Sequence, residues 1–284
     1  MKKPLKITLI SVLIFLLLAG TTFSVLYFCR PKGQARSDIA VSSNNNTYIE
    51  GNTKNIAECS PAESLFILAF NLKKSNSYYA VISGEVNAGG IYKQAISGAK
   101  YKSGEDALYI SRSTSFLKNT ADQIFIRNDA VLVRKGDPKT NVFKDAVTEY
   151  SLNEYIDEYG LDFRELSNYE LNENNITKAE LVSAVDGLYT FRYEINVETG
   201  VKDYRVNMYK MGGLSELPTF SKSTLEVVMT ENFMPKTITQ IDEYKVNMVF
   251  TLSCKSTLVE TFETINDDSV IIPEHEFFVS KLDG

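Results

Sequence analysis

An uncharged stretch from Ile7 to Cys29 constrains the fold of this chain more than any other feature of its sequence. The stretch is 23 residues long. A helix of that length spans about 35 Å, enough to cross the hydrocarbon core of a bilayer. Basic residues lie on both sides of it, as they do beside membrane-spanning helices. We therefore expect a transmembrane anchor over residues 7–29, preceded by a short basic tail over residues 1–6.

Two other interpretations of this stretch stay open. Lys2 and Lys3 could be the basic start of a cleaved signal peptide, and Cys29 could be an acylated cysteine. An uncleaved signal-anchor agrees best with the length of the stretch. Because long domains are translocated largely regardless of their charge, we expect a single-pass membrane protein with its C-terminal domain outside the cytoplasm.

The charges of the chain are distributed unevenly. The first 36 residues carry six lysines and arginines and no acidic residue, and the remainder has a net charge of −12. Proteins that bind nucleic acids use lysine and arginine against the phosphates, so an acidic domain argues against a nucleic-acid partner. Hydrophobic residues make up 44% of the chain, which is ordinary for a globular protein.

The chain behind the anchor divides into two parts. Residues 30–57 are rich in Ser, Asn, Thr and Gly and lack a sustained apolar period, which is typical of a flexible linker. We expect residues 58–284 to form an extracytoplasmic domain, which is long enough to bury a substantial core.

Three segments carry the capping-box signature of a helix start: Ser60–Glu63, Ser151–Glu154 and Thr177–Glu180. In each of them a hydroxyl residue is followed three positions later by a glutamate. Apolar residues at helical spacing come next, and the second and third segments are followed by Gly160 and Gly187, which suit helix ends. We predict a helix after each of these three starts.

Most of the remaining domain alternates between apolar and polar residues, which predicts β-strands. The predicted strands cover residues 78–86, 91–100, 107–113, 123–127, 130–134, 189–197, 204–208, 225–229 and 244–252, with a further strand near Leu258 and Phe262. One apolar face per strand is typical of an antiparallel sheet with one solvated side. The order of elements predicts an α+β domain in which a few helices cover one face of an antiparallel sheet.

The segment Thr224–Ile238, TLEVVMTENFMPKTI, is similar to the strand, proline-containing turn and strand of one group of bacterial envelope proteins. This is the half-barrel group of lipoprotein carriers and anti-sigma regulators that includes LolA, LppX and RseB. The element order resembles theirs over about 200 residues. The resemblance implies a strongly curved sheet that cradles acyl chains or binds another envelope protein. It assigns no role to any single residue.

The sequence lacks the common motifs for catalysis, metal binding and cofactor binding. The chain has no Gly-x-Ser-x-Gly elbow, no Walker loop, and one histidine, His275, without the second histidine of a zinc helix. We expect His275 to be solvated or hydrogen-bonded, and the eight acids between Glu149 and Glu173 to form a solvated helical face. We therefore expect no catalytic residue, no metal ligand and no cofactor.

A set of apolar and aromatic residues is the candidate for a ligand pocket or for the core. It comprises Leu65, Phe66, Ala69, Leu72, Tyr189, Phe191, Tyr193, Tyr244 and Phe250. The strands with Phe191 and Tyr244 should turn their apolar faces toward the helix that begins after Ser60. Complete cover by that helix would make these residues a packed core, and incomplete cover would leave a cavity for an acyl chain.

Cys59 and Cys254 are the two cysteines outside the predicted anchor. They are a candidate disulfide of an exported domain, and two separate buried thiols are the alternative.

Two classes of function are consistent with these features. The first is a membrane-tethered, non-catalytic domain that binds a lipid, an acyl chain or another envelope protein. The second is an envelope hydrolase or transferase whose catalytic groups meet only in the folded structure.

Overall fold

The computed structural model describes residues 45–51, 53–90, 92–115, 119–212, 214–247 and 251–282. The predicted anchor at residues 7–29, most of the predicted linker and the candidate residue Phe250 lie outside these ranges. Within them, no helix combines the length and the apolar character needed to cross a membrane.

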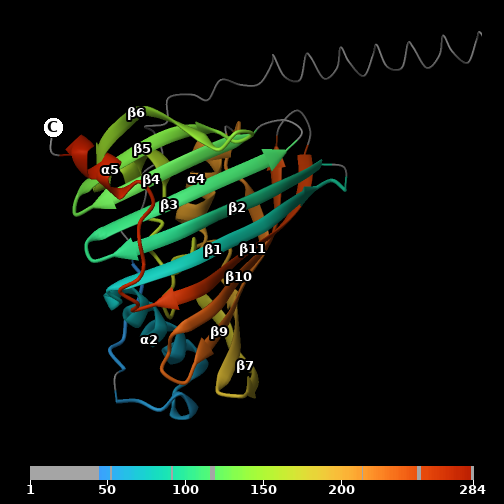
Figure 1. Ribbon diagram of the computed structural model, residues 1–284. Coiled ribbons are helices and arrows are strands. Elements are labelled where there is room, and N and C mark those ends of the chain that lie inside the picture. The colour runs from blue at the N-terminus through green and yellow to red at the C-terminus, as the bar shows by residue number, and fades with distance from the viewer. Residues whose placement is uncertain are drawn as a thin grey trace, which may run out of the picture.

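The described residues form one antiparallel sheet of eleven strands (Figure 1). Its strands are β1 (Ser77–Ala88), β2 (Tyr92–Ser103), β3 (Asp106–Ser115), β4 (Thr120–Arg127), β5 (Ala130–Asp137), β6 (Val142–Ser151), β7 (Ile176–Val185), β8 (Leu188–Ile195), β9 (Thr219–Thr230), β10 (Pro235–Asn247) and β11 (Thr251–Ile265). They are arranged in the order β6-β5-β4-β3-β2-β1-β11-β10-β9-β8-β7. Pairing of β1 with β11 therefore joins two meanders into one sheet, whose free edges are β6 and β7.

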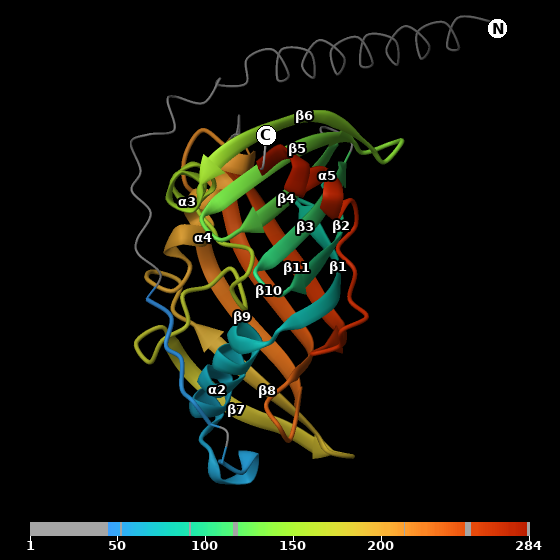
Figure 2. The same cartoon turned by 60° about the vertical axis from the view of Figure 1, so that its left-hand side comes forward.

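The sheet is strongly curved, and the helices are distributed over its two faces (Figure 2). The helices are η2 (Ile56–Glu58, a 3-10 turn), α2 (Pro61–Lys74), α3 (Leu152–Tyr159), α4 (Lys202–Gly212) and α5 (His275–Leu282). Helices α2, α3 and α4 lie on the concave side, whereas α5 lies on the convex side over β4 and β5. The predicted α+β class and antiparallel sheet with a few covering helices are confirmed for the described residues.

Two of the three predicted helix starts are confirmed. The Ser60 hydroxyl accepts a hydrogen bond from the Glu63 amide at 3.2 Å, at the start of α2. At the start of α3 the bonding is reciprocal, because Ser151 caps the Glu154 amide and Glu154 accepts from the Ser151 amide at 2.8 Å. Gly160 ends α3 with a φ of 88°, a conformation that favours glycine.

The third predicted helix is wrong, because residues 176–185 form strand β7. The Thr177 hydroxyl, expected to cap a helix, instead donates to the Glu194 carbonyl of β8 at 3.1 Å. Capping is worth only about 1 kcal/mol, so a ladder of pairs with β8 outweighs it. Conversely, the strand predicted at 204–208 is part of helix α4. Val201, Tyr204 and Met208 pack on the main core at the spacing of a helix. Tyr204, Val206 and Met208 also alternate with polar residues, and we interpreted that alternation as a strand.

The segment that we predicted as one strand over 244–252 belongs to two strands, because β10 ends at Asn247 and β11 begins at Thr251. Strand β6 and helix α5 were not predicted at all. Strand β9 begins six residues before the strand predicted at 225–229, and β1 to β5 and β8 agree with the predicted strands to within three residues at each end.

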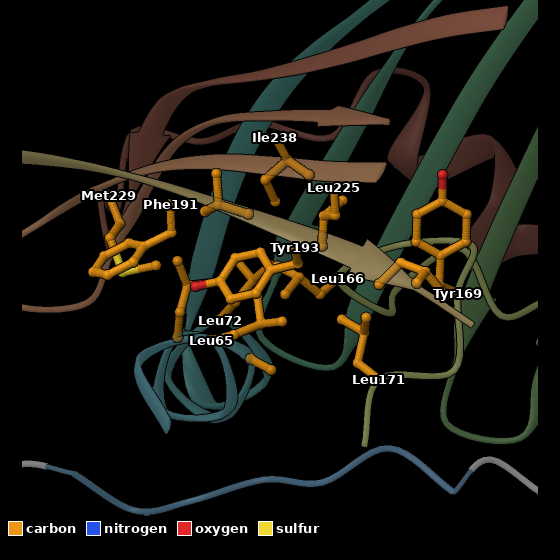
Figure 3. Close-up of a cluster of buried hydrophobic side chains, with 14 of the residues drawn as sticks. Leu65, Leu72, Leu166, Tyr169, Leu171, Phe191, Tyr193, Leu225, Met229 and Ile238 are labelled. Atoms are coloured by element: carbon orange, nitrogen blue, oxygen red, sulfur yellow. The ribbon is translucent and has the colours of Figure 1, made fainter. Parts of the chain in front are cut away.

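The main core lies between α2 and the concave face of β8 to β11 (Figure 3). Leu65 on α2, Tyr193 on β8 and Leu225 on β9 are completely buried there. The Tyr193 hydroxyl also donates to the Pro61 carbonyl at 2.9 Å, which fixes the start of α2 over the sheet. The prediction that the strands carrying Phe191 and Tyr244 turn toward this helix is confirmed.

A short segment at the start of the described chain also packs on this core. The Thr47 amide donates to the Leu171 carbonyl at 2.8 Å, and the Ile49 amide donates to the Phe66 carbonyl at 3.2 Å. Residues 45–51 thus lie along α2, although they belong to the segment that we predicted as linker.

Candidate functional site

The concave face of the sheet is the candidate site, and strand register defines which residues belong to it. Directly paired residues of neighbouring antiparallel strands point to the same face. Ile238 lies in the main core on the concave side and pairs with Glu260, which pairs with Ile82, which pairs with Gly98. This row of pairs follows the concave face from β10 to β2.

The end of this face that is covered by α2 contains most of the residues predicted as pocket or core. Leu65, Leu72 and Phe191 pack together there (Figure 3). Phe66, Ala69, Tyr193 and Tyr244 are also buried, and Tyr189 is half-buried against the same core. Apart from Phe66, the predicted residues that the structure describes thus belong to one continuous core. Phe250 lies outside the described residues. That any of these side chains contacts a ligand stays a prediction.

A buried carboxyl group occupies the middle of the concave face. Asp242 on β10 is only 1% exposed and accepts hydrogen bonds from the hydroxyls of Tyr169 at 2.8 Å and Ser223 at 2.7 Å. The Ser256 hydroxyl approaches its other oxygen at 3.4 Å. Both serines are the direct cross-strand partners of Asp242, on β9 and β11. Three hydroxyls from three different segments therefore surround this one acid.

Burial raises the pKa of Asp242 to about 6, because the hydrogen bonds from Ser223, Tyr169 and Ser256 offset only part of the cost of removing the carboxylate from water. Burial also raises the pKa of Tyr169 and Tyr204 well above 10. Asp242 is therefore the group in this cluster that titrates near neutral pH.

A second polar pair lies farther along the concave face. Lys100 on β2 reaches across β1 to Glu260 on β11, with 2.8 Å between Nζ and Oε2. Both side chains are nearly buried, and Ala80 and Ile82 of β1 lie between them in the ladder. The two charges compensate each other, so the pair leaves no net charge on the face. It lies between the core under α2 and the part of the face described next.

Beyond this pair, a part of the concave face is half-buried and has no ionisable side chain of its own. We call this region the uncovered patch. It consists of Gly84, Val86, Gln94, Ile96, Gly98, Ser111, Ser113 and Leu258. The patch borders Asp122 of β4, the direct partner of Ser111, and Asp122 binds Lys135 at 2.7 Å. Val86, Ile96 and Leu258 supply apolar surface, whereas the glycines and serines are small. The opposite face of the same strands carries exposed polar residues such as Ser83, Glu85, Lys93 and Ser97.

The glycines of the uncovered patch also bring the strands close to one another. A Cβ atom on Gly84 would lie 2.6 Å from the Thr257 carbonyl oxygen of β11, closer than real contacts allow. A glycine inside a strand often marks a sharp bend or a close approach of another backbone. The missing side chain of Gly84 therefore permits the close approach of β11 at this point of the patch.

The convex face has its own polar cluster under α5. Asp106 at the start of β3 accepts two hydrogen bonds from Arg127, at 2.6 and 2.7 Å, and lies 2.6 Å from the Nε2 atom of His275. Burial raises the pKa of Asp106, but the bonds from Arg127 and His275 outweigh burial and leave the pKa below its usual value. His275 is thus hydrogen-bonded, in agreement with one of the two alternatives that we expected.

The acids between Glu149 and Glu173 do not share one helix. Only Glu154, Asp157 and Glu158 lie on α3. Asp162 binds Arg164 in the loop that follows, with 2.6 Å between Oδ2 and Nη2. The prediction of one solvated helical face is therefore wrong, because α3 ends at Gly160 and the chain continues without regular structure.

Both described cysteines are free thiols. Cys59 precedes α2, whereas Cys254 pairs with Ala88, the residue that ends β1. Burial raises the pKa of Cys254 to about 11, which makes its thiol a poor nucleophile. The structure therefore shows two separate thiols and no bridge. Among the described residues, no group of three or more His, Cys, Asp or Glu side chains could hold a metal ion.

Comparisons with known proteins give only distant similarities to solved structures. No family model matches the chain, and no curated protein matches it. Among solved structures, a LolA superfamily protein from Nitrosomonas europaea is 12% identical, with 77% of this chain and 98% of that chain covered, at a TM-score of 0.30. A LolA-type protein, the resemblance predicted from the sequence, is thus among the structures that this chain is similar to.

Two further solved structures are similar to this chain. A de novo designed transmembrane β-barrel is 8% identical, with 66% of this chain and 97% of that chain covered, at a TM-score of 0.22. MucB in complex with MucA(peri) is 7% identical, with 72% of this chain and 94% of that chain covered, at a TM-score of 0.13. At such values, function has to be inferred from this chain's own residues.

Proposed function

We propose that this chain is a membrane-tethered, extracytoplasmic domain that binds the acyl chain of a lipid on the uncovered patch. One observation carries the proposal: the patch has no ionisable side chain of its own and stays partly open to solvent, whereas the neighbouring core under α2 is buried. Apolar surface that is concave and open to solvent suits an apolar ligand, because binding removes that surface from water.

The side chains of the patch suit a chain-like ligand. Val86, Ile96 and Leu258 come from three neighbouring strands, since Gly84 of β1 pairs with both Ile96 and Leu258. Gly84 carries no side chain between them. An acyl chain could therefore lie across the three strands in contact with all three aliphatic side chains.

The sequence supports the membrane part of the proposal. The uncharged residues 7–29 are long enough to cross a bilayer, and only 15 residues separate them from Asn45, where the described chain begins. As a flexible coil, such a linker spans about 20 Å. The domain would then stay beside the membrane that supplies its ligand.

A pair of matched valines on β1 tests the proposed site. Val86 lies in the uncovered patch, whereas Val81 lies on the opposite face and is itself partly exposed. We expect Val86→Asp to weaken binding of a fluorescent fatty-acid probe about tenfold or more, because a carboxylate would have to be desolvated against the acyl chain. Val81→Asp is the control and should bind as the unaltered protein does. Equal affinity of both variants, or no binding by any of them, would overturn the proposal.

Binding of another envelope protein is the second candidate function, and the edge strand β7 favours it. Leu181, Val182 and Val185 are 50%, 45% and 62% exposed, and Leu188 on the neighbouring strand is 38% exposed. An apolar edge strand presents unpaired backbone groups to any other strand. Photo-crosslinking from Val182 in intact cells, with Ser97 as the control position, tests it. An adduct specific to Val182 is expected, and identical patterns at both positions would refute this candidate.

A further inference from the structure

The segment between α3 and β7, residues 160–175, lies over the middle of the concave face, and we call it the strap. It contains no helix or strand. Leu166, Tyr169 and Leu171 of the strap are buried in the same core as Tyr193 and Leu225 of the sheet (Figure 3). The strap therefore closes the concave face between α2 and α3.

Two hydrogen bonds connect the strap with strand β10 beneath it. The Tyr169 hydroxyl donates to Asp242 at 2.8 Å, and the Asn168 amide donates to the side-chain oxygen of Gln240 at 3.2 Å. Gln240 and Asp242 are both nearly completely buried. Whatever changes the charge of Asp242 therefore acts directly under the strap.

The groups that face Asp242 leave its charge uncompensated. They are Tyr169 from the strap, Ser223 from β9, Ser256 from β11, Tyr204 from α4 and Tyr244 from β10. Among the described residues, other buried acids form ion pairs, as Glu260 does with Lys100. No ion pair of the described residues involves Asp242. The tyrosines and serines stay neutral at neutral pH, so no cation balances the carboxylate.

The two charge states of Asp242 consequently favour different positions of the strap. A protonated carboxyl is neutral and is well accommodated among the hydroxyls. An ionised carboxylate needs water, and moving the strap away would admit water to this buried position.

We propose that the strap is a pH-sensitive cover, which stays closed while Asp242 is protonated and opens more often when Asp242 is ionised. Opening extends the uncovered patch toward β10 and β9, so the acyl-binding surface grows as the pH rises. This step rests on the proposed function, whereas the motion of the strap can be tested without any ligand.

Hydrogen exchange of the strap amides in the ligand-free protein tests the motion. With the pKa of Asp242 near 6 when closed and at its ordinary value of 3.8 when hydrated, the opening constant should rise about tenfold between pH 5 and pH 7. After correction for intrinsic exchange, we expect that rise in residues 160–175 and no comparable rise in β4 and β5.

Two variants make the test specific. Asp242→Asn keeps the size of the side chain and removes its charge, so strap exchange should become independent of pH. Glu243→Gln alters the next residue of β10, which is exposed on the opposite face, and should behave as the unaltered protein does. A flat profile in the unaltered protein, or the same tenfold rise in Asp242→Asn, would overturn the proposal.

A ligand measurement separates this proposal from the proposed function. We expect the affinity for the fatty-acid probe to increase from pH 5 to pH 7 in the unaltered protein and to stay constant in Asp242→Asn. Loss of all probe binding with a pH-dependent strap would refute the acyl site alone. PH-independent exchange with intact probe binding would refute the strap mechanism alone.

Discussion

Asp242 shows how the burial of a single residue contributes to the pH dependence of stability. It is buried without a cation and bound by neutral hydroxyls. Its pKa is about 6 in the folded protein, above the ordinary value of 3.8 in the unfolded chain. The folded protein therefore binds more protons than the unfolded one between about pH 4 and pH 6, and this acid lowers stability as the pH rises through that range.

We expect Asp242→Asn to be about as stable as the unaltered protein near pH 4 and more stable by up to about 3 kcal/mol at pH 7. Urea unfolding of both proteins at several pH values measures this difference. The pKa values of Asp106 and Glu274 are lowered in the folded protein, so these two acids change the free energy of unfolding with pH in the opposite direction. Both proteins contain them, so their contribution cancels in the difference. A variant that is less stable than the unaltered protein at pH 7 would contradict the assigned burial cost.

Phe233 shows backbone strain at the scale of one residue. It has a φ of 54° in the turn between β9 and β10, a conformation that is rare for bulky side chains, and its ring is buried in the main core. Burial of the phenylalanine ring stabilises the domain by more than the backbone strain costs, which is about 1 kcal/mol.

We accordingly expect Phe233→Gly to destabilise the domain by about 2–4 kcal/mol, since the relief of strain recovers only part of the lost burial. Phe233→Leu should cost less than the glycine variant, because it keeps apolar contact. Thermal unfolding measures both. A glycine variant as stable as the unaltered protein would show that the ring contributes little.

At the scale of elements, α5 illustrates a helix that is fixed to the sheet mainly by aromatic packing. The completely buried ring of Phe278 stacks on Phe125 of β4, with 4.9 Å between the ring centroids. Around this pair, His275 contacts Asp106, and Glu274 contacts Arg134 at 2.9 Å.

We expect Phe278→Ala to cost about 3–5 kcal/mol and to release α5 selectively. Hydrogen exchange should increase in residues 275–282 far more than in α2, which packs on the opposite face of the sheet. Glu276→Ala, at an exposed position of the same helix, is the control and should change stability by less than about 0.5 kcal/mol. Uniform loss of protection across both helices would contradict separate packing of α5.

The sequence predicted most elements correctly, for identifiable physical reasons. The caps at Ser60 and Ser151 lie beside apolar helical faces, so local and tertiary preferences agree. At Thr177 they disagree, because pairing with β8 outweighs a local cap. Asp242 was overlooked although its position carries a signal: it interrupts the apolar side of an alternating strand between Ile238 and Tyr244. That signal shows a buried acid but does not reveal Tyr169, which comes from a distant segment.

The uncovered patch could not be derived in the same way. Its residues come from β1, β2, β3 and β11, and their exposure depends on where α2, α3 and the strap end. Alternation assigns a residue to a face of a strand. It does not tell which part of that face another element covers.

At the scale of the whole molecule, a domain with a partly covered concave face follows a predicted membrane anchor. We expect the full chain, of 31.9 kDa, to stay in the membrane fraction after washing with alkaline carbonate. A chain lacking residues 1–36 should be released and still fold, because the described core begins later. When the full chain is expressed, recovery of a soluble form that starts between residues 20 and 45 would contradict the anchor.

The central claim is that an acyl chain contacts the uncovered patch, and tryptophan fluorescence tests it most directly because the chain has no tryptophan of its own. Val86→Trp places the single fluorophore in the patch, and Val81→Trp places it on the opposite face of the same strand. Titration with a brominated fatty acid, whose bromine atoms quench tryptophan only at contact, should quench Val86→Trp saturably and leave Val81→Trp unchanged. Equal quenching of both variants, or none in either, would contradict the account.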